Sequence, residues 1–163
     1  MNPEIIIRDI QVTDNPLIAK IIRDSLEEFG ANKPGTVYFD PSTDHLFELF
    51  QSNHLSHYLV ATCKTVLLGG AGIFPTRGLP EYCCELVKMY LKADARGMGL
   101  GGKMIANCLE IAAAKGFRQV YLETMPELKK AVAVYEQFGF EYLNGPMGDS
   151  GHNGCDIWML KNL

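Results

Sequence analysis

Short apolar runs alternate along the chain with longer segments in which apolar residues recur at a helical period. The β-branched run at residues 4–10 is short and predicts a strand. A helix is predicted to begin near Thr13 and Asp14, where a capping side chain precedes Pro16, and to end at Gly30. Its apolar positions are Ile18, Ile21, Ile22, Leu26 and Phe29.

The rest of the chain divides in the same way into helices, strands and loops rich in glycine and proline. Helices are predicted at residues 42–51, 99–115 and 128–138. Strands are predicted at residues 57–63, 65–74, 82–91, 119–124, 140–143 and 155–160. Loops are predicted at 31–41, 75–80 and 144–154. This order predicts a mixed α/β domain in which a β meander precedes a strand–helix–strand unit, and not a doubly wound parallel sheet.

Length and charge restrict the functional classes. The 163 residues contain no repeat and no linker, so we expect a single domain over residues 1–163. The 15 basic and 19 acidic side chains give a net charge of −4, which disfavours binding to nucleic acid or to an anionic membrane. No segment has the run of apolar residues that spans a membrane, and the first residues lack the features of a signal peptide. We therefore expect a cytoplasmic protein.

The cysteines and histidines predict neither a disulfide framework nor a metal site. The five cysteines are an odd number and include no Cys-x-x-Cys pair, so we expect reduced thiols. The adjacent Cys83 and Cys84 are the first exception to consider. Because His45, His54 and His57 show no metal-like pairing with carboxylates, we expect no metal.

The segment most informative about chemistry is Arg96-Gly97-Met98-Gly99-Leu100-Gly101-Gly102-Lys103. It lies between a predicted strand and a predicted helix. Glycines let backbone N–H groups approach an anion, and a helix N-terminus adds free N–H groups and a positive dipole end. The segment therefore predicts a phosphate or pyrophosphate site. A glycine-rich helix entry without a ligand is the alternative.

Two other phosphate-binding loops fit this segment poorly. A Walker A loop requires Ser or Thr after the lysine, but Met104 follows Lys103. The dinucleotide fingerprint is matched literally by residues 97–102. However, the preceding strand ends a β meander instead of opening a strand–helix–strand unit.

With its surroundings, this segment resembles the acyl-CoA pyrophosphate loop of the GNAT superfamily of N-acetyltransferases. The likeness rests on Arg96-x-x-Gly99-x-Gly101, on strand 84–91, and on segment 131–140 with its Tyr-x-x-x-Gly-Phe pattern. Segments 7–16 and 155–159 extend it over nearly the whole chain. The resemblance implies a GNAT-like α/β fold: a central mixed, mostly antiparallel twisted sheet of about six to seven strands flanked by about four helices.

The resemblance also implies acetyl-CoA as the cosubstrate, bound where the fourth and fifth strands splay apart. The main chain of Met89, Tyr90 and Leu91 would contact the pantetheine arm. The pyrophosphate would be held by Arg96, Gly97, Met98, Gly99, Leu100, Gly101, Gly102 and Lys103. Many relatives also contact the arm through an asparagine seven residues before the tyrosine, where this chain has Leu128.

Glu85 and Tyr135 are the catalytic residues that the resemblance implies. Glu85 matches the general base of some members, acting directly or through a water. Strand alternation places it on one face with Val87 and Met89, whose apolar side chains are expected to raise its pKa. Tyr135 matches the residue that protonates the departing thiolate, and the Met89 N–H would stabilise the oxyanion. The alternatives are an ordinary strand glutamate and a packed helix tyrosine.

The expected acceptor is a primary amine of a small molecule or an amino acid. Its site would form from the first helices and the loops at 75–80 and 144–154. Arg77 is a candidate partner for a substrate carboxylate, and Glu27 or Glu28 for an amine, although each also fits an ordinary surface charge.

Three questions stay open at this level. His152 lies in a glycine-flanked loop and is expected to be exposed. A CoA-binding sensor without catalysis, and an enzyme that acetylates a protein N-terminus or lysine, are the alternatives to a small-molecule enzyme. The protein is expected to be a monomer or a homodimer.

Charge is distributed unevenly along the chain. Residues 85–118 hold six basic and three acidic side chains, a surplus of +3, so the remainder carries −7. The basic surplus surrounds the predicted pyrophosphate segment, as an anionic cofactor requires.

Overall fold

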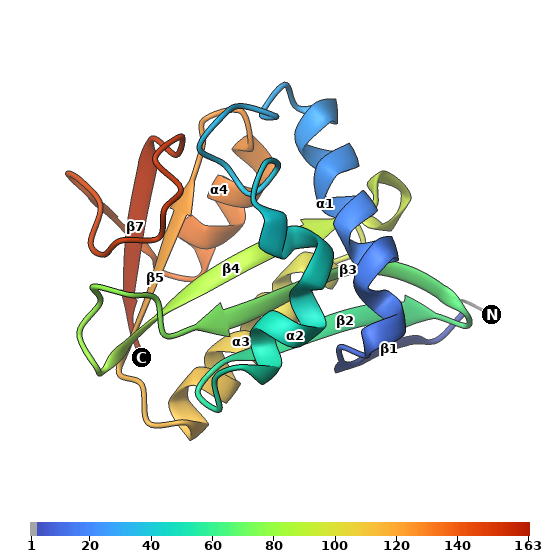
Figure 1. Cartoon of the computed structure of the whole chain (residues 1–163), viewed down its shortest axis with the longest axis horizontal. Helices are drawn as coiled ribbons and strands as arrows, with labels where there is room; N and C mark the ends of the chain where they lie inside the picture. Colours follow the sequence, from blue (N-terminus) through green and yellow to red (C-terminus); the bar gives the residue numbers. More distant parts are fainter. Residues whose placement is uncertain (1–2) are drawn as a thin grey trace.

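The structure is a computed structural model and describes residues 3–163. These residues form a seven-stranded sheet of order β1-β2-β3-β4-β5-β7-β6 (Figure 1). The strands are β1 Ile5–Asp9, β2 His57–Cys63, β3 Val66–Phe74, β4 Cys83–Leu91, β5 Gln119–Thr124, β6 Glu141–Leu143 and β7 Ile157–Asn162. Neighbouring strands are antiparallel except β4 and β5, which are parallel. The predicted mixed, mostly antiparallel sheet is confirmed.

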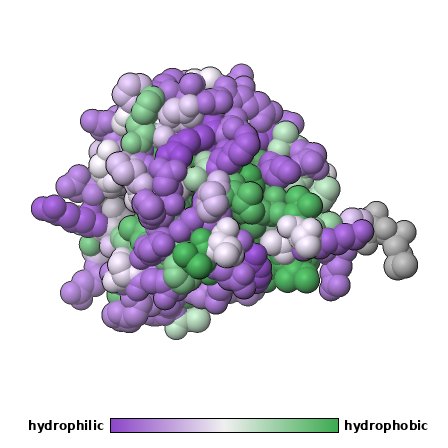
Figure 2. Space-filling view, turned by 45° about the vertical axis from the view of Figure 1, so that its right-hand side comes forward, coloured by the Kyte–Doolittle hydropathy of each residue, from purple (hydrophilic) through white to green (hydrophobic). Residues whose placement is uncertain are grey.

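Four α-helices cover the two faces of this sheet. They are α1 Asn15–Glu28, α2 Leu46–Gln51, α3 Leu100–Ala114 and α4 Lys129–Gln137. Helices α1 and α2 pack on one face of the sheet, and α3 and α4 contribute to the hydrophobic core on the other (Figure 1). The face seen in Figure 2 is largely hydrophilic, with apolar side chains in limited areas, because the helices bury most of the apolar sheet surface.

The predicted helix at 42–51 is wrong in its first half. A 3-10 turn at Pro41–His45 precedes α2, and His45 has φ −133° and ψ 45°, which interrupts a continuous helix. The turn is set by Asp40, whose carboxylate accepts a hydrogen bond from the Ser42 N–H, and by Pro41 in its first position. Local capping therefore separates a short turn from a short helix.

Strand β4 contains a bulge that the sequence pattern did not indicate. In the register with β3, Val87 lies opposite Gly72 and Tyr90 lies opposite Gly70. Two residues of β4, Lys88 and Met89, are therefore placed against one residue of β3. Lys88 has φ +51°, a conformation uncommon for a residue with a side chain.

The bulge reverses which side chains share a face of β4. Val87 packs with the core beneath α1 and α2, whereas Met89 and Leu91 pack with the core beneath α3. The expectation that Glu85 and Val87 share a face with Met89 and Leu91 is therefore wrong. One extra residue changes the two-residue alternation on which that expectation depended.

Tyr58 holds the bulge from the neighbouring strands. Its hydroxyl donates a hydrogen bond of 2.8 Å to the Lys88 carbonyl oxygen. Its ring lies so close to Gly70 and Gly72 that a Cβ atom at either position would approach the ring to within 2.6 Å. These two glycines are therefore required for the close approach that places the tyrosine under the bulge.

Candidate active site

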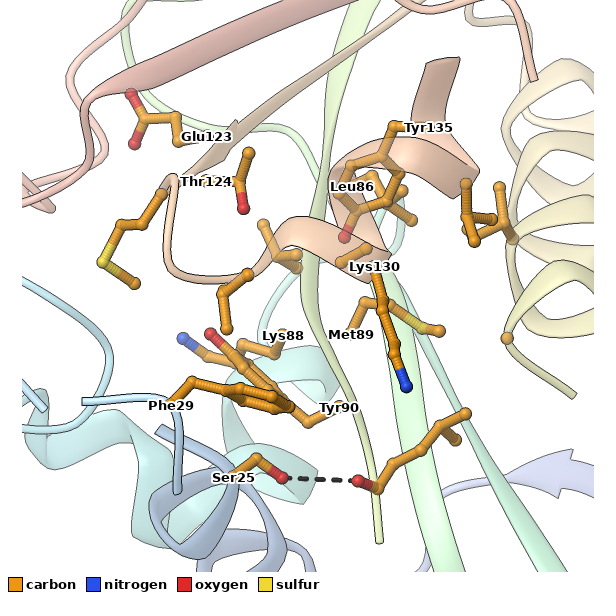
Figure 3. Close-up of a pocket in the computed structure, with 18 of the residues that line it drawn as sticks. Ser25, Phe29, Leu86, Lys88, Met89, Tyr90, Glu123, Thr124, Lys130 and Tyr135 are labelled. Carbon is orange, nitrogen blue, oxygen red and sulfur yellow. Dashed lines mark hydrogen bonds between the residues drawn. The ribbon is translucent and has the colours of Figure 1, made fainter. Parts of the chain in front are cut away.

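A cavity opens where β4 and β5 diverge. Their pairing ends at Glu85 and Tyr121, although β4 continues to Leu91 and β5 to Thr124. The space between them measures about 370 Å³ and runs from the glycine-rich segment at the start of α3 to Glu123 and His152. Figure 3 shows side chains from α1, β4, β5 and α4 around it.

One end of this cavity, here called the donor end, is formed by the glycine-rich segment. Gly97 and Gly99 have φ of +81° and +78°, and no heavy atom lies within 4 Å of a Cβ built on either. Gly101 faces Met89, whose Cε would lie 3.3 Å from such a Cβ. The first turn of α3 therefore presents N–H groups beside open space, which suits an anion.

Arg96 lines the cavity but already has partners. Its Nε and Nη2 donate to the Leu91 carbonyl oxygen at 3.1 and 2.9 Å, and Nη1 donates to Glu28 Oε2 at 2.8 Å. The guanidinium also lies 4.9 Å from the centre of the Phe29 ring. Arg96 thus joins the end of α1 to the end of β4, where the segment begins.

Glu85 lines the cavity and is 4% exposed. Burial, helped by the charge of Glu123, raises its pKa to about 7, while a hydrogen bond from Thr76 and the charge of Lys88 oppose this shift. The Thr76 hydroxyl donates to Glu85 Oε1 at 2.6 Å. A carboxyl group with this pKa can accept a proton near neutral pH. The predicted rise is confirmed, and burial is its largest cause, although Met89 packs on the other face of β4.

Tyr135 lies on α4, and its hydroxyl points into the cavity (Figure 3). Its ring packs edge-on against Phe140, with ring centres 5.9 Å apart. Burial raises the pKa of this phenol above its ordinary value. The hydroxyl therefore stays protonated near neutral pH and keeps a proton that it can donate to an anion formed beside it.

The other end of the cavity, here called the acceptor end, is built from distant segments. Asp40 Oδ2 lies 3.0 Å from His152 Nε2 and 3.9 Å from Lys88 Nζ. Burial raises the pKa of Asp40, but hydrogen bonds from His152 and Ser42 outweigh it and lower the pKa to about 2. Asp40 is therefore an anion across the physiological pH range.

Glu123 adds a second carboxylate to the acceptor end. Its oxygens accept hydrogen bonds from the Tyr121 hydroxyl, at 2.7 Å, and from the Ser150 hydroxyl. The Tyr121 hydroxyl in turn accepts the Met147 N–H at 3.1 Å. Glu123 thus connects β5 to the 144–154 loop that covers the site.

A family model described as the acetyltransferase (GNAT) family matches residues 19–140. This chain belongs to the GNAT family. The "Uncharacterized N-acetyltransferase YjgM" of Escherichia coli strain K12 is 39% identical to it over 97% of this chain and 95% of that protein. The predicted family and its N-acetyltransferase activity are therefore confirmed.

Solved GNAT structures share the fold. A GNAT-family acetyltransferase from Staphylococcus aureus Mu50 has a TM-score of 0.85 at 15% identity, over 98% of this chain and 99% of that one. The PaiA N-acetyltransferase of Thermoplasma acidophilum, solved in complex with coenzyme A, has a TM-score of 0.77 at 19% identity over the same shares.

In this GNAT chain, most of the predicted CoA-binding residues line the cavity. Those that do are Met89, Tyr90, Leu91, Arg96, Gly97, Gly99, Gly101 and Gly102. Met98 and Lys103 are exposed outside it, and the Leu100 side chain is buried in the core. Leu128 also lines the cavity. The side chains of Met98, Leu100 and Lys103 therefore do not line the cavity, although their backbone belongs to the same segment.

Two cavity residues that the sequence reasoning missed are Lys129 and Lys130, which open α4. The Lys130 ammonium points into the cavity (Figure 3). Lysines at a helix N-terminus oppose the helix dipole, and this unfavourable placement is the signal that could have found them. By contrast, Lys115 from the basic 85–118 segment lies outside the cavity and donates to the His54 carbonyl oxygen.

Two of the residues expected near the acceptor, Arg77 and Glu28, lie outside the cavity. Arg77 is exposed and does not line the cavity, and Glu28 is paired with Arg96. The expectation that His152 is exposed is wrong, since only 17% of its side chain is accessible. Its loop packs on the 31–41 loop, where the Gly154 N–H donates to the Gly35 carbonyl oxygen at 2.8 Å.

Within residues 3–163, no group of three or more His, Cys, Asp or Glu side chains is arranged to hold a metal ion. The helices of this same range are all too short or too polar to cross a membrane.

Proposed function

We propose that this GNAT protein transfers the acetyl group of acetyl-CoA to a primary amine of a small molecule or amino acid, by direct attack in a ternary complex. The observation that carries the proposal is Glu85, a buried carboxyl with a pKa of about 7. It shares one cavity with Tyr135 and the glycine-rich segment. An amine is protonated near neutral pH and must lose a proton before attack, so such a base is what the reaction needs.

Acetyl-CoA as donor is supported by the donor end. The start of α3 faces open space at Gly97 and Gly99. Lys129 and Lys130 line the same cavity and add positive charge. The edge of β4 that faces β5 is unpaired beyond Glu85, which leaves backbone groups for the pantetheine arm. The thioester, when bound, supplies an activated acetyl group. The relative solved with coenzyme A supports the same class of cosubstrate.

The proposed roles follow from these positions. Glu85 accepts the proton of the acceptor ammonium, directly or through a water. Met89 lies in the bulge and has no partner in the β3 register, which leaves its N–H to stabilise the oxyanion. Tyr135 donates its proton to the departing thiolate sulfur. A single domain and a cytoplasmic location remain predictions from the sequence.

The competing function is a CoA sensor without catalysis. A sensor needs the donor end but has no use for a buried carboxyl with a pKa near neutrality beside it. The observation therefore favours the enzyme. Acetylation of a protein N-terminus or lysine uses the same donor end and differs only in the acceptor.

Thiol release from acetyl-CoA, measured across a panel of amines, amino acids and peptides, tests the proposal. We expect acceptor-dependent release with acetylated small molecules detected by mass spectrometry. Tight CoA binding without release on any acceptor would establish the sensor instead. Release with peptides alone would establish a protein acetyltransferase.

A further inference from the structure

Lys88 is a buried cation that the proposed reaction does not use. Only 5% of its side chain is exposed, and it lines the cavity. It lies in the β4 bulge with φ +51°, held by the hydrogen bond from Tyr58 to its carbonyl oxygen. A buried ammonium in a strained backbone position needs a compensating role, because both features are unfavourable by themselves.

The ammonium of Lys88 has few partners within the protein. Among residues 3–163, none forms a hydrogen bond with its Nζ, although an ammonium carries three donors. The nearest carboxylate oxygen is Asp40 Oδ2, at 3.9 Å. That oxygen lies 3.0 Å from His152, and the other oxygen of Asp40 accepts the Ser42 N–H. Asp40 thus offsets the charge of Lys88 but accepts no hydrogen bond from the Lys88 ammonium, whose three N–H donors stay free within the described part of the chain.

The surroundings of Lys88 separate it from the donor end. In Figure 3 its nitrogen lies on the opposite side of the cavity from that of Lys130. Burial lowers the pKa of Lys88, while the charges of Asp40 and Glu85 oppose this shift, and the charge of Lys88 in turn lowers the pKa of Glu85. Glu123 also lies close enough to shift the pKa of Glu85, but its negative charge raises that pKa. Lys88 therefore lies near the carboxyl groups of Asp40 and Glu85, and Glu85 in turn lies near that of Glu123.

This arrangement matches a molecule that carries an ammonium beside a carboxylate. The ammonium is attracted by Glu85 and Glu123, and the carboxylate accepts the free donors of Lys88. We propose that Lys88 binds the carboxylate of the acceptor, and that the acceptor is an amino acid. The inference rests on the proposed function of the same cavity, and it assigns to Lys88 the role that the sequence suggested for Arg77.

Paired ligands test the inference, each pair sharing one side chain with and without the carboxylate. Suitable pairs are leucine and isoamylamine, phenylalanine and phenethylamine, and histidine and histamine. Binding to the CoA-loaded protein is measured by calorimetry, and acetylation is measured in parallel. The test variant is Lys88→Met. The control is Lys64→Met, because Lys64 also has positive φ, at +54°, but is exposed on the β2–β3 turn.

We expect the protein to prefer the amino acid in at least one pair. Lys88→Met should weaken amino acid binding by roughly 10- to 100-fold, the usual weight of a hydrogen bond to a charged group. Binding of the matching amine should change little, and Lys64→Met should affect neither. Asp40→Asn, which keeps an oxygen for the Ser42 N–H, should retain or increase the preference for the carboxylate.

The two proposals fail in distinguishable ways. Acetylation of amines without any preference for the carboxylate would overturn this inference and retain the proposed function. Equal loss of both ligands in Lys88→Met would also overturn it. Binding of amino acids that depends on Lys88, without acetylation, would retain this inference and overturn the proposed function. Absence of binding by every pair would overturn both.

Discussion

The donor and acceptor ends of the cavity are built in different ways. The donor end is dominated by backbone groups from one contiguous segment, in which Gly97 and Gly99 adopt positive φ and α3 begins directly afterwards. The acceptor end consists of side chains from four separate parts of the chain, represented by Asp40, Lys88, Glu123 and His152. Backbone groups of one segment are enough to bind an anion of general structure. Side chains from several segments are needed to recognise one particular small molecule.

The contrast also concerns electrostatics. At the donor end, Lys129 and Lys130 combine with the N-terminus of α3 to favour an anion. At the acceptor end, burial and hydrogen bonds together set the charges. Burial raises the pKa of Glu85 to about 7, whereas hydrogen bonds outweigh burial at Asp40 and keep it anionic. The two ends should therefore respond to different substitutions.

Replacement of Glu85 should give the largest effect and should leave the donor end intact. Glu85→Gln keeps an oxygen for the Thr76 hydroxyl but cannot accept a proton, so kcat should fall by about 100- to 10,000-fold. In the unsubstituted protein, kcat/KM should rise with pH through about 7, as the carboxyl loses its proton, and this rise should vanish in the variant.

The exposed Glu81, changed to Gln, serves as the control for this pH profile. CoA affinity measured by calorimetry should be the same in both variants. An undiminished rate, or a pH dependence that survives in Glu85→Gln, would remove Glu85 from the proposed role.

Replacement of Tyr135 tests its proposed role as the acid that protonates the departing thiolate. Tyr135→Phe keeps the ring that packs on Phe140 but removes the acidic hydroxyl, so kcat should fall by about 100-fold with CoA affinity retained. Steady-state kinetics and calorimetry measure the two quantities. The exposed Tyr142, changed to Phe, is the matched control. Turnover equal to that of the control would contradict the acid assignment.

A change in the glycine-rich segment should act on the donor end alone. Gly99→Ala forces a side chain into φ +78°, which costs about 1 kcal/mol and displaces the first turn of α3. We expect CoA to bind roughly tenfold more weakly, while the apparent pKa of Glu85 in the pH profile stays unchanged.

Gly145→Ala is the control, because Gly145 lies in open space without a positive φ. Calorimetric titration with CoA compares the two variants. Equal CoA affinity in both would show that the conformation at Gly99 does not matter for the donor end.

The smallest effect concerns the hydrogen bond between Asp40 and His152, which joins the 31–41 loop to the 144–154 loop. Because the pKa of Asp40 is lowered to about 2 in the folded protein, its ionised form stabilises the fold above about pH 4, and this stability is lost as the pH falls toward 2. Asp40→Asn should lower the Tm at pH 7, and the difference from the unsubstituted protein should shrink on acidification.

Thermal unfolding at several pH values measures this difference, with the exposed Asp94 changed to Asn as the control. A difference that is constant with pH would contradict the assignment of an anionic Asp40.

The sequence by itself determined the order of the elements, the family and the donor end. Strand β5 was predicted with its observed bounds, and the start of α3 with an error of one residue, because β-branched runs and glycine-rich helix starts are local features. Glu85 and Tyr135 were predicted from the resemblance to the GNAT family, and both line the cavity; their catalytic roles stay predictions. The sequence pattern that identifies each of these two residues lies within its own segment of the chain.

The tertiary structure alone decided the acceptor end. The bulge at Lys88 depends on Tyr58, Gly70 and Gly72 on neighbouring strands, and it exchanges the two faces of β4. The burial of His152 depends on a loop more than a hundred residues away, since its partner Asp40 is 112 positions earlier. Sequence periodicity reports only neighbours along the chain, whereas charge burial and strand register are set by contacts between distant segments.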